Sequence, residues 1–347
     1  MKDSKKEISF FNRYLSIWVI ICMVIGIFIG QFIPQIPNFL NKFQYANVSI
    51  PMAILIWLMI YPMMMKVDFQ SIKNVGKNPK GLFLTWLVNW AIKPFTMFLI
   101  AWFFFFVVFS RVIDVNLARE YLAGAVLLGA APCTAMVFVW SHLTKGDPAY
   151  TVVQVASNDL IILIAFVPIV KFLLGVTNVY VPWDTLILSV VLFVVIPLIA
   201  GIFTRHIVEK NKGIFYFENK FIKKFDGLTT VGLLLTLILI FSFQSDTIVS
   251  NPSHIILIAI PLTLQTFLIF AISFISSRLI RLPFKVAAPA CMIGASNFFE
   301  LAVAVAIALF GMDSPAALAT TVGILTEVPI MLLLVNIANK SRKLFKS

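Results

Sequence analysis

Residues 294–304 read Gly-Ala-Ser-Asn-Phe-Phe-Glu-Leu-Ala-Val-Ala and lie near the middle of a long apolar run, 286–310. A second apolar run, 121–141, contains the related stretch Gly129-Ala-Ala-Pro-Cys133. Weak internal similarity between two parts of an apolar chain is typical of transporters built from inverted repeats. Chance similarity between two helices rich in small residues is the competing interpretation.

The segments that follow the two stretches are also alike. Each stretch continues into small and β-branched residues and then into a short loop, Asp147-Pro148-Ala149 in one case and Asp313-Ser314-Pro315-Ala316 in the other. Each loop leads into an apolar run with an acid near its middle, Asp159 or Glu327. The similarity therefore extends beyond one short motif, as a repeat requires.

The composition places these runs in a membrane. Of the 347 residues 61% are hydrophobic and only 12% are charged, whereas soluble domains have about 25% charged residues. So few charged residues could not cover the water-facing surface of a soluble protein. The same figures exclude a disordered chain and a collagen-like repeat. The three cysteines, Cys22, Cys133 and Cys291, all lie inside apolar runs, so a disulfide framework is not expected.

A transmembrane helix needs about 20 apolar residues. Ten segments qualify: 14–33, 48–66, 82–109, 121–141, 150–174, 184–204, 227–246, 254–277, 286–310 and 315–337. Ten spans divide into two sets of five. Because five is odd, the first set ends on the opposite side of the membrane, and the second set enters from there. We therefore expect an all-α, polytopic membrane protein that forms one domain over residues 1–347, with repeats at about 14–174 and 184–337.

The basic residues indicate how the chain is oriented. Of the 27 lysines and arginines, 22 lie in the N-terminus, the C-terminus and the loops after spans 2, 4, 6 and 8. The positive-inside rule therefore predicts that both termini are cytoplasmic. The net charge of +12 follows from this topology and would lie against anionic lipid, so nucleic acid is not an expected partner.

Four ionisable residues lie well inside the predicted spans, away from their ends: Lys93, Asp159, Glu300 and Glu327. A charge at the centre of a membrane helix costs about 2.5–3.5 kcal/mol, and such groups usually face a cavity or the bundle interior. Glu300 is the strongest candidate for function, since Asn297 lies three residues earlier, on the same face of a continuous helix. A protonated Glu300 that forms only an inter-helix hydrogen bond is the structural alternative.

Lys93 and Cys133 leave two further questions open. Lys93 either extends to the membrane surface or neutralises one of the buried acids. Cys133 follows Pro132, which interrupts helical hydrogen bonding, and precedes Thr134. A thiolate there would bind soft, thiophilic ions, whereas Cys22 and Cys291 are expected to be apolar fillers.

The chain resembles the arsenical-resistance permeases, which are arsenite efflux carriers of the bile acid/arsenite/riboflavin transporter superfamily. The resemblance extends over almost the whole chain and rests on six motifs: Trp57-Leu-Met-Ile-Tyr-Pro-Met63, Lys73-Asn-Val-Gly-Lys-Asn-Pro79, Trp90-Ala-Ile-Lys-Pro-Phe95, Gly129-Ala-Ala-Pro-Cys-Thr-Ala-Met-Val-Phe-Val-Trp140, Gly294-Ala-Ser-Asn-Phe-Phe-Glu-Leu-Ala-Val-Ala304 and Thr326-Glu-Val-Pro329.

This resemblance implies ten helices in two inverted five-helix repeats, with discontinuous helices 4 and 9 that cross near the membrane midplane. It also implies proton-driven export of trivalent arsenic across the plasma membrane, with antimonite as a second substrate in some members. The family's functional cysteine maps onto Cys133, and its two glutamates map onto Glu300 and Glu327. No cofactor and no obligate ATPase subunit are expected.

The implied chemistry agrees with the residues present. Arsenite at neutral pH is mostly uncharged As(OH)₃, and a single thiol such as Cys133 binds As(III) weakly enough for release. We expect Thr134 and Asn297 to contact the substrate and Glu300 to bind the coupled proton, with Glu327 and Asp159 as further proton-coupling candidates.

Other functions are distinguishable. A sodium-coupled organic-anion symporter of the same superfamily is the main alternative, because acids and amides also coordinate sodium. A membrane enzyme is disfavoured, since the sequence has no histidine pair with metal-ligand spacing and no phosphate-binding loop. A passive channel would continue to conduct after the proton gradient collapsed.

Overall fold

The computed structural model describes residues 15–45, 48–66, 79–134, 136–250 and 252–345. Residues 1–14 lie outside these ranges, and so do residues 73–78 of the motif Lys73–Pro79 that contributes to the family resemblance. The regular secondary structure of the described chain is helical apart from one antiparallel pair of two-residue strands, β1 (Gln44–Tyr45) and β2 (Val48–Ser49). The all-α prediction is therefore confirmed at the level of fold class, with this small strand pair as an unexpected addition.

Each predicted span contains at least one described helix. Five helical stretches are long and apolar enough to cross a membrane: Pro79–Val108, Pro148–Val176, Trp183–Phe225, Pro252–Leu279 and Pro315–Leu344. Shorter apolar helices occupy Ile20–Phe32, Ile50–Pro62, Val231–Phe243, Phe284–Ala295 and Phe299–Phe310. The principal elements are α2 (Leu15–Phe32), α3 (Gln35–Asn41), α4 (Ile50–Met64), α6 (Pro79–Trp86), α7 (Lys93–Trp102), α8 (Val115–Ala130), α9 (Met136–Leu143), α10 (Pro148–Val176), α11 (Trp183–Val190), α12 (Ile196–Tyr216), α13 (Lys223–Phe243), α14 (Ser245–Ser250), α15 (Pro252–Leu279), α16 (Phe284–Ala295), α17 (Phe299–Phe310) and α18 (Pro315–Lys340).

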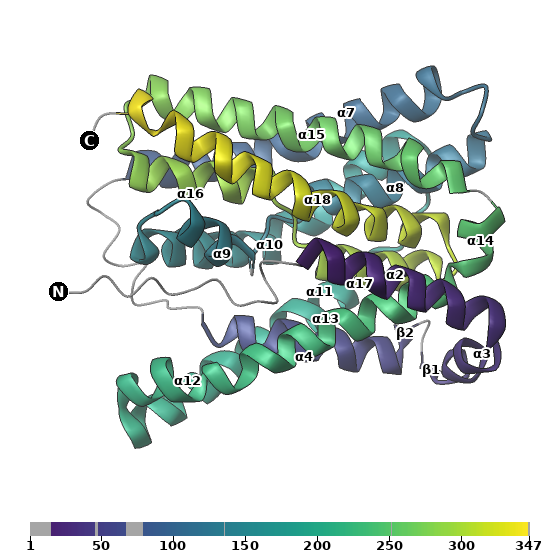
Figure 1. Ribbon diagram of the computed structural model, residues 1–347, viewed down its shortest axis with the longest axis horizontal. Helices are drawn as coiled ribbons and strands as arrows, with labels where there is room; N and C mark the ends of the chain where they lie inside the picture. The colour runs from purple at the N-terminus through teal and green to yellow at the C-terminus, as the bar shows by residue number, and fades with distance from the viewer. Residues whose placement is uncertain (1–14, 46–47, 67–78, 135, 251, 346–347) are drawn as a thin grey trace.

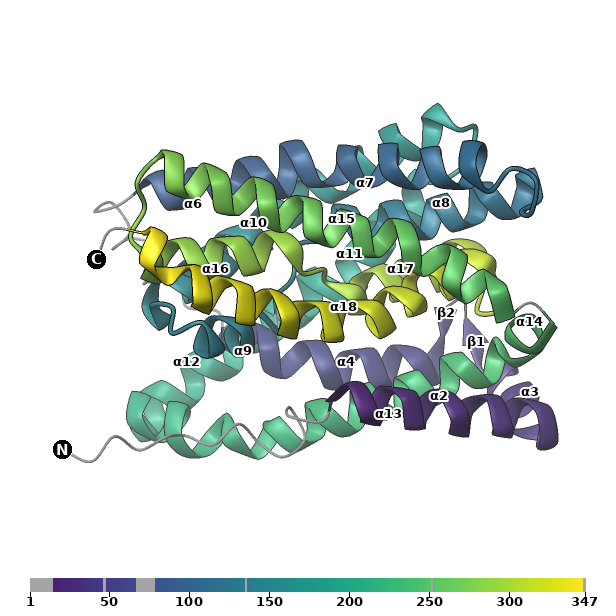
Figure 2. The same ribbon diagram turned by 45° about the horizontal axis from the view of Figure 1, so that its top comes forward.

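The long helices run side by side in two groups (Figures 1 and 2). In one group α13 packs against α2 and α4, and α4 also contacts α12; we call this the flanking group. In the other, α8 packs against α7 and α18, and α15 packs against α16 and α18; we call this the crossing group. Contacts of α17 with α4 and α11 connect the two groups.

Local sequence explains where the helices begin. Asp147 caps α10 by accepting hydrogen bonds from the backbone N–H groups of Ala149 and Tyr150, and Pro148 occupies the first turn. Ser314 caps α18 in the same way by accepting from the N–H of Ala317. An oxygen-bearing cap followed by proline is a strong helix start signal. The two loops recognised as similar in the sequence therefore do the same structural task.

Two predicted spans are interrupted. The helical run of span 4 stops at Ala130 and resumes at Met136, and that of span 9 stops at Ala295 and resumes at Phe299. The two breaks meet: Pro132 and Asn297 form an antiparallel bridge, and the Phe298 N–H donates to the Ala131 carbonyl oxygen at 2.8 Å. Non-helical backbone at membrane depth is tolerated only where it is buried in protein or lines a cavity. The two breaks therefore satisfy some of each other's backbone hydrogen-bonding groups.

Close packing of small residues holds the crossing group together. A Cβ placed on Gly124 of α8 would come within 2.4 Å of the Ala316 carbonyl oxygen of α18. The missing side chain therefore allows the two backbones to touch, as small residues commonly do between membrane helices. This contact connects the broken span 4 to the helix that contains Glu327.

Candidate functional site

Cys133 lies in the break between α8 and α9 and is 2% exposed. Its thiol packs among Val137, Val155 and Ile293, and Ser296 of the opposite break lies beside it. The other two thiols lie elsewhere: Cys22 in α2, and Cys291 in α16 at 3.9 Å from the Ser277 hydroxyl. Within the described part of the chain, therefore, one thiol is present where the two breaks meet, a place that we call the crossing.

Glu327 of α18 is bonded to the opposite break through both carboxylate oxygens. Its Oε1 accepts from the Ser296 hydroxyl at 2.5 Å and from the Asn297 backbone N–H at 3.0 Å. Its Oε2 accepts from the Asn297 side-chain amide at 3.0 Å. A buried carboxylate with three donors is well satisfied. Glu327 therefore holds the break of span 9 in place.

This geometry corrects the expected relation between Asn297 and Glu300. The two were expected to share one face of a continuous helix, but α17 begins only at Phe299, after the N-cap residue Phe298. Asn297 lies in the break, and its amide group donates to Glu327. The helical spacing rule does not apply because the intervening backbone is not helical.

Lys93 is buried, with 1% of its surface exposed. Its Nζ donates to the Ser296 carbonyl oxygen at 2.5 Å, and it interacts electrostatically with Glu327. Of the two alternatives left open for Lys93, this burial excludes extension to the membrane surface, and the ammonium group lies near the buried acid Glu327. Gln265 of α15 supports this lysine by donating to the Lys93 carbonyl oxygen at 3.1 Å.

Glu300 differs from Glu327 in its partners. It lies in the first turn of α17 and is 4% exposed. Within the described residues no side chain donates a hydrogen bond to its carboxylate. The first turn of a helix favours negative charge through the exposed backbone N–H groups. Glu300 is also within electrostatic range of Glu327 and of Cys133.

Asp159 and Thr134 border a small cavity on the α10 side of the crossing. The cavity has a volume of about 10 Å³, and Lys66 also lines it. Both carboxylate oxygens of Asp159 and the hydroxyl of Thr134 are buried without a hydrogen-bond partner in the described structure. A space of this size holds about one water molecule. The cavity is therefore a polar site that one small ligand can complete.

Hydrogen bonds from two tryptophans fix α10 against the helical stretch Pro79–Val108. Trp86 Nε1 donates to the Ser157 hydroxyl at 2.9 Å, and Trp90 Nε1 donates to Asn158 Oδ1 at 3.1 Å. These contacts position the helix turn that carries Asp159. Together with Ser296 and Gln265, the tryptophans are residues that the sequence analysis did not assign to the site. Ser296 lies inside the motif quoted first, whereas Gln265 has no distinguishing local signal.

The site thus brings five of the six predicted residues to the crossing: Cys133, Thr134, Asn297, Glu300 and Glu327. Asp159 lies beside it, across the cavity shared with Thr134. One thiol, several unpaired polar atoms and two acids with different partners suit a small polar solute that binds reversibly. They do not form a dense metal cage, since no group of three or more His, Cys, Asp or Glu residues converges in the described ranges.

Comparison with known proteins places the chain among membrane transporters. The Sodium Bile acid symporter family matches residues 53–251. The arsenical-resistance protein Acr3 of Alkaliphilus metalliredigens is 63% identical over 340 residues, which cover 98% of this chain and 95% of that protein. An uncharacterized transporter of Synechocystis is 46% identical over 96% of this chain and 90% of its own length. The Acr3 protein of Corynebacterium glutamicum is 34% identical over 95% of this chain and 89% of its own length.

Proposed function

This chain belongs to the Acr3 arsenical-resistance family of the bile acid symporter superfamily, whose members are transporters and not enzymes, and on that premise we propose that it exports arsenite from the cytoplasm in exchange for protons. It is a multi-pass membrane protein. The proposal places it in the plasma membrane. The observation that carries the proposal is the buried thiol of Cys133, which lies in one of the two breaks that meet at Pro132 and Asn297.

The proposed architecture is ten spans in two inverted repeats, 14–174 and 184–337. Three features support it: the interrupted helix is the fourth in each set, each interruption is followed by a capped loop with proline, and the next helix in each set contains a buried acid. The breaks of α8–α9 and α16–α17 would cross near the midplane, where such transporters bind their substrates.

Loop contacts support the proposed topology. At one end the Asp147 N–H donates to the Lys285 carbonyl oxygen at 2.9 Å, and the Asn339 amide donates to the Leu143 carbonyl oxygen at 3.1 Å. The loops after spans 4 and 8 and the end of span 10 therefore lie together. At the other end Gln244 donates to the Met312 carbonyl oxygen at 2.5 Å, which joins the loops after spans 7 and 9. The first end contains the basic excess, so we assign it to the cytoplasm.

Arsenic chemistry matches the polar atoms at the crossing. The thiol of Cys133 and one hydroxyl of As(OH)₃ form an S–As bond and release water, so no net charge enters the membrane. The oxygen of the Asn297 amide and the hydroxyl of Thr134 are both buried and unpaired within the described structure. Either can take up a hydrogen bond from the remaining As–OH groups. A single thiol keeps the complex reversible, which a carrier needs. Antimonite, which is also trivalent and thiophilic, is a second proposed substrate.

Proton coupling would supply the driving force. Since As(OH)₃ is neutral, the membrane potential alone cannot drive it outward. One inward proton per solute provides about 2.3 kcal/mol per 100 mV, enough for roughly a 50-fold gradient. Glu300 is the proposed proton carrier, because no side chain in the described structure holds its carboxylate, whereas three donors hold that of Glu327. Asp159 is a second proton-binding candidate beside its cavity.

A resistance assay with arsenic measurement tests the proposed substrate. The chain should lower intracellular arsenic when it is expressed in a bacterial strain without an arsenite exporter. Cys133→Ser should abolish most of this effect, and Cys291→Ser is the matched control because Cys291 is equally buried but lies away from the crossing. Arsenic levels that stay unchanged on expression of the native chain would refute the proposal.

The sodium-coupled organic-anion symporter remains the second candidate function, and the family match over residues 53–251 favours it. Two results with the purified protein in liposomes would distinguish it. The uptake of an organic anion would depend on sodium, and a pH gradient would not change the transport of arsenite. Unpaired oxygens at Asp159 and Asn297 support this candidate, because carboxylate and amide oxygens also coordinate sodium.

A further inference from the structure

The end of α16, at the break in span 9, is a place that favours a cation. Ser296 is the C-cap residue of α16, so its carbonyl oxygen lies at the negative end of this half-helix. In transporters with interrupted helices, such half-helix ends and unwound carbonyl groups coordinate the coupling Na⁺ or H⁺. The sodium-coupled candidate function would therefore place its ion at this end of α16.

In this chain the ammonium group of Lys93 lies at that place. Its Nζ is 2.5 Å from the Ser296 carbonyl oxygen. Lys93 also interacts electrostatically with Glu327, whose Oε1 accepts a hydrogen bond from the hydroxyl of the same serine. The lysine is 1% exposed, so protein encloses the charge. One fixed positive charge therefore lies beside a broken-helix carbonyl and a carboxylate, the two kinds of group that a bound sodium ion would use.

The backbone of Lys93 is anchored where its side chain leaves α7. Lys93 is the first residue of α7 and follows the π-helical stretch Leu87–Ile92. Such wide helical turns are rare and occur frequently at functional sites. Gln265 of α15 holds this turn, because its amide donates to the Lys93 carbonyl oxygen at 3.1 Å and to the Thr96 hydroxyl at 3.0 Å. The ammonium group therefore reaches the end of α16 from a fixed starting point.

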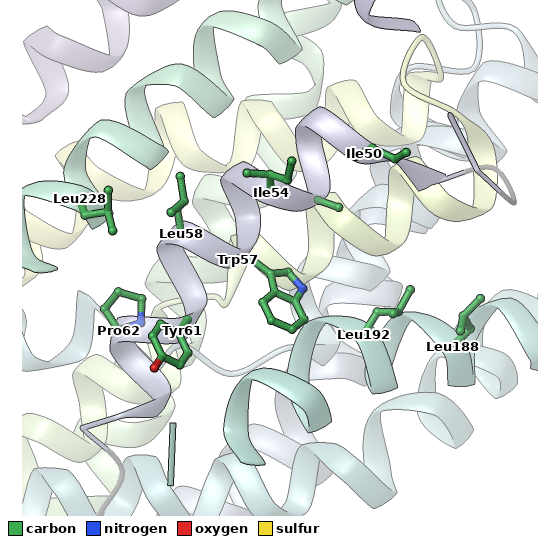
Figure 3. A pocket seen from close by; sticks show the side chains of 10 residues that line it. Ile50, Ile54, Trp57, Leu58, Tyr61, Pro62, Leu188, Leu192 and Leu228 are labelled. Carbon is green, nitrogen blue, oxygen red and sulfur yellow. The ribbon is translucent and has the colours of Figure 1, made fainter. Parts of the chain in front are cut away.

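The apolar groove of the flanking group is poorly suited to a sodium ion. It runs along α4 and has a volume of about 630 Å³. Figure 3 shows Trp57 between α4 and the facing helix, and the other labelled side chains are aliphatic apart from Tyr61. The Tyr61 hydroxyl is 2.7 Å from the Thr204 hydroxyl. Because a bound ion needs oxygen ligands in place of its hydration shell, the crossing suits sodium better than this groove does.

We propose that Lys93 supplies a built-in cation that takes the place of a coupling sodium ion, so that the native chain does not bind sodium at the end of α16. The charge is covalently attached to α7 and cannot leave with the solute. A sodium ion beside the same carbonyl would be repelled by the ammonium group. Replacing Lys93 by a small neutral residue should therefore open the place to sodium. The proposal concerns the cation and holds whichever solute is transported.

Sodium binding to the purified full chain tests this proposal. Binding of radioactive sodium is measured in detergent at constant ionic strength, with choline chloride as the replacing salt. Lys93→Ala should bind one sodium ion more than the native chain. Its melting temperature should also rise with sodium concentration, because a ligand that binds only the folded protein stabilises it. Lys93→Arg keeps the positive charge and should behave like the native chain.

Lys171 provides the matched control. Its ammonium group also donates to a backbone carbonyl, that of Val181, but this pair lies near the end of α10 and away from the crossing. Lys171→Ala should therefore bind no additional sodium. Adding Glu327→Gln to Lys93→Ala should abolish the additional binding, because it removes the carboxylate.

Lys93→Gln, which is also neutral, serves if Lys93→Ala does not fold. The proposal would be overturned if the neutral Lys93 variants bound no more sodium than the native chain, or if Lys171→Ala gained as much sodium as they did. None of these measurements uses arsenite, so their result is separate from that of the arsenic assay.

Discussion

Replacing Glu327 by methionine should destabilise the protein far more than the same change at Glu300. The side chain of Glu327 accepts hydrogen bonds from the Ser296 hydroxyl, the Asn297 N–H and the Asn297 amide, so Glu327→Met leaves three buried donors unpaired. Each unpaired donor costs about 1–3 kcal/mol, and Lys93 also loses a nearby anion. The expected loss in the free energy of unfolding is about 3–5 kcal/mol, the range measured when one partner of a buried charged pair is removed.

Glu300→Met removes no side-chain hydrogen bond recorded in the described structure and should cost less than about 1 kcal/mol. Glu327→Gln should recover most of the lost stability, because the amide of Asn297 can turn its unpaired oxygen toward the new NH₂ group. Denaturant titration in mixed detergent micelles measures all three variants against the native chain. If the two methionine variants differ by less than about 1 kcal/mol, the assignment of Glu327 as the residue that holds the break is refuted.

Three further changes test other parts of the account. Cys133→Ser should weaken arsenite binding by at least ~10-fold by calorimetry, with Cys291→Ser unchanged; equal affinity would remove the thiol from the site. Gly124→Ala should lower the free energy of unfolding by about 1–3 kcal/mol, because its Cβ would lie 2.4 Å from a carbonyl oxygen of α18; unchanged stability in denaturant titration would mean that the α8–α18 contact relaxes. Burial and the nearby Asp246 raise the pKa of Asp313, so the folded protein binds this proton more tightly than the unfolded chain and stability should fall as the pH rises above the usual ~3.9. Asp313→Asn should flatten that dependence in melting curves between about pH 4 and 6, and an unchanged slope would show that other groups cause it.

Hydropathy sufficed to predict where the long apolar helices lie, because burial in lipid requires long apolar runs. The loops with Asp147 and Ser314 were similar in the sequence, and the structure adds that both residues cap the helices that follow. Hydropathy does not show how far a helix extends beyond the membrane. The apolar segment 184–204 ends before α12 does, since α12 continues to Tyr216 with a change of direction at Gly213, where φ is 80°. Lysine and glutamate lower the hydropathy without disfavouring a helix.

The contacts made at the two helix breaks are the part of the site that could not be predicted from the sequence. Pro132 gives a local reason for an interruption in span 4, whereas no proline marks the break at 296–298, which was expected only from the family resemblance. Once span 9 is treated as continuous, helical spacing pairs Asn297 with the wrong acid. The partner of Lys93 is a backbone carbonyl that only a broken helix exposes. Such contacts depend on two segments that are far apart in sequence, and a residue pattern within one helix does not contain them.

The central claim is that arsenite export is coupled to protons through Glu300. The most direct measurement is arsenite uptake into everted membrane vesicles with an imposed pH gradient, acidic inside, compared with an imposed sodium gradient. The native chain should accumulate arsenite only with the pH gradient, and Glu300→Gln should abolish the accumulation while the protein stays folded. Full proton-driven uptake by Glu300→Gln, or uptake driven by sodium alone, would contradict the account.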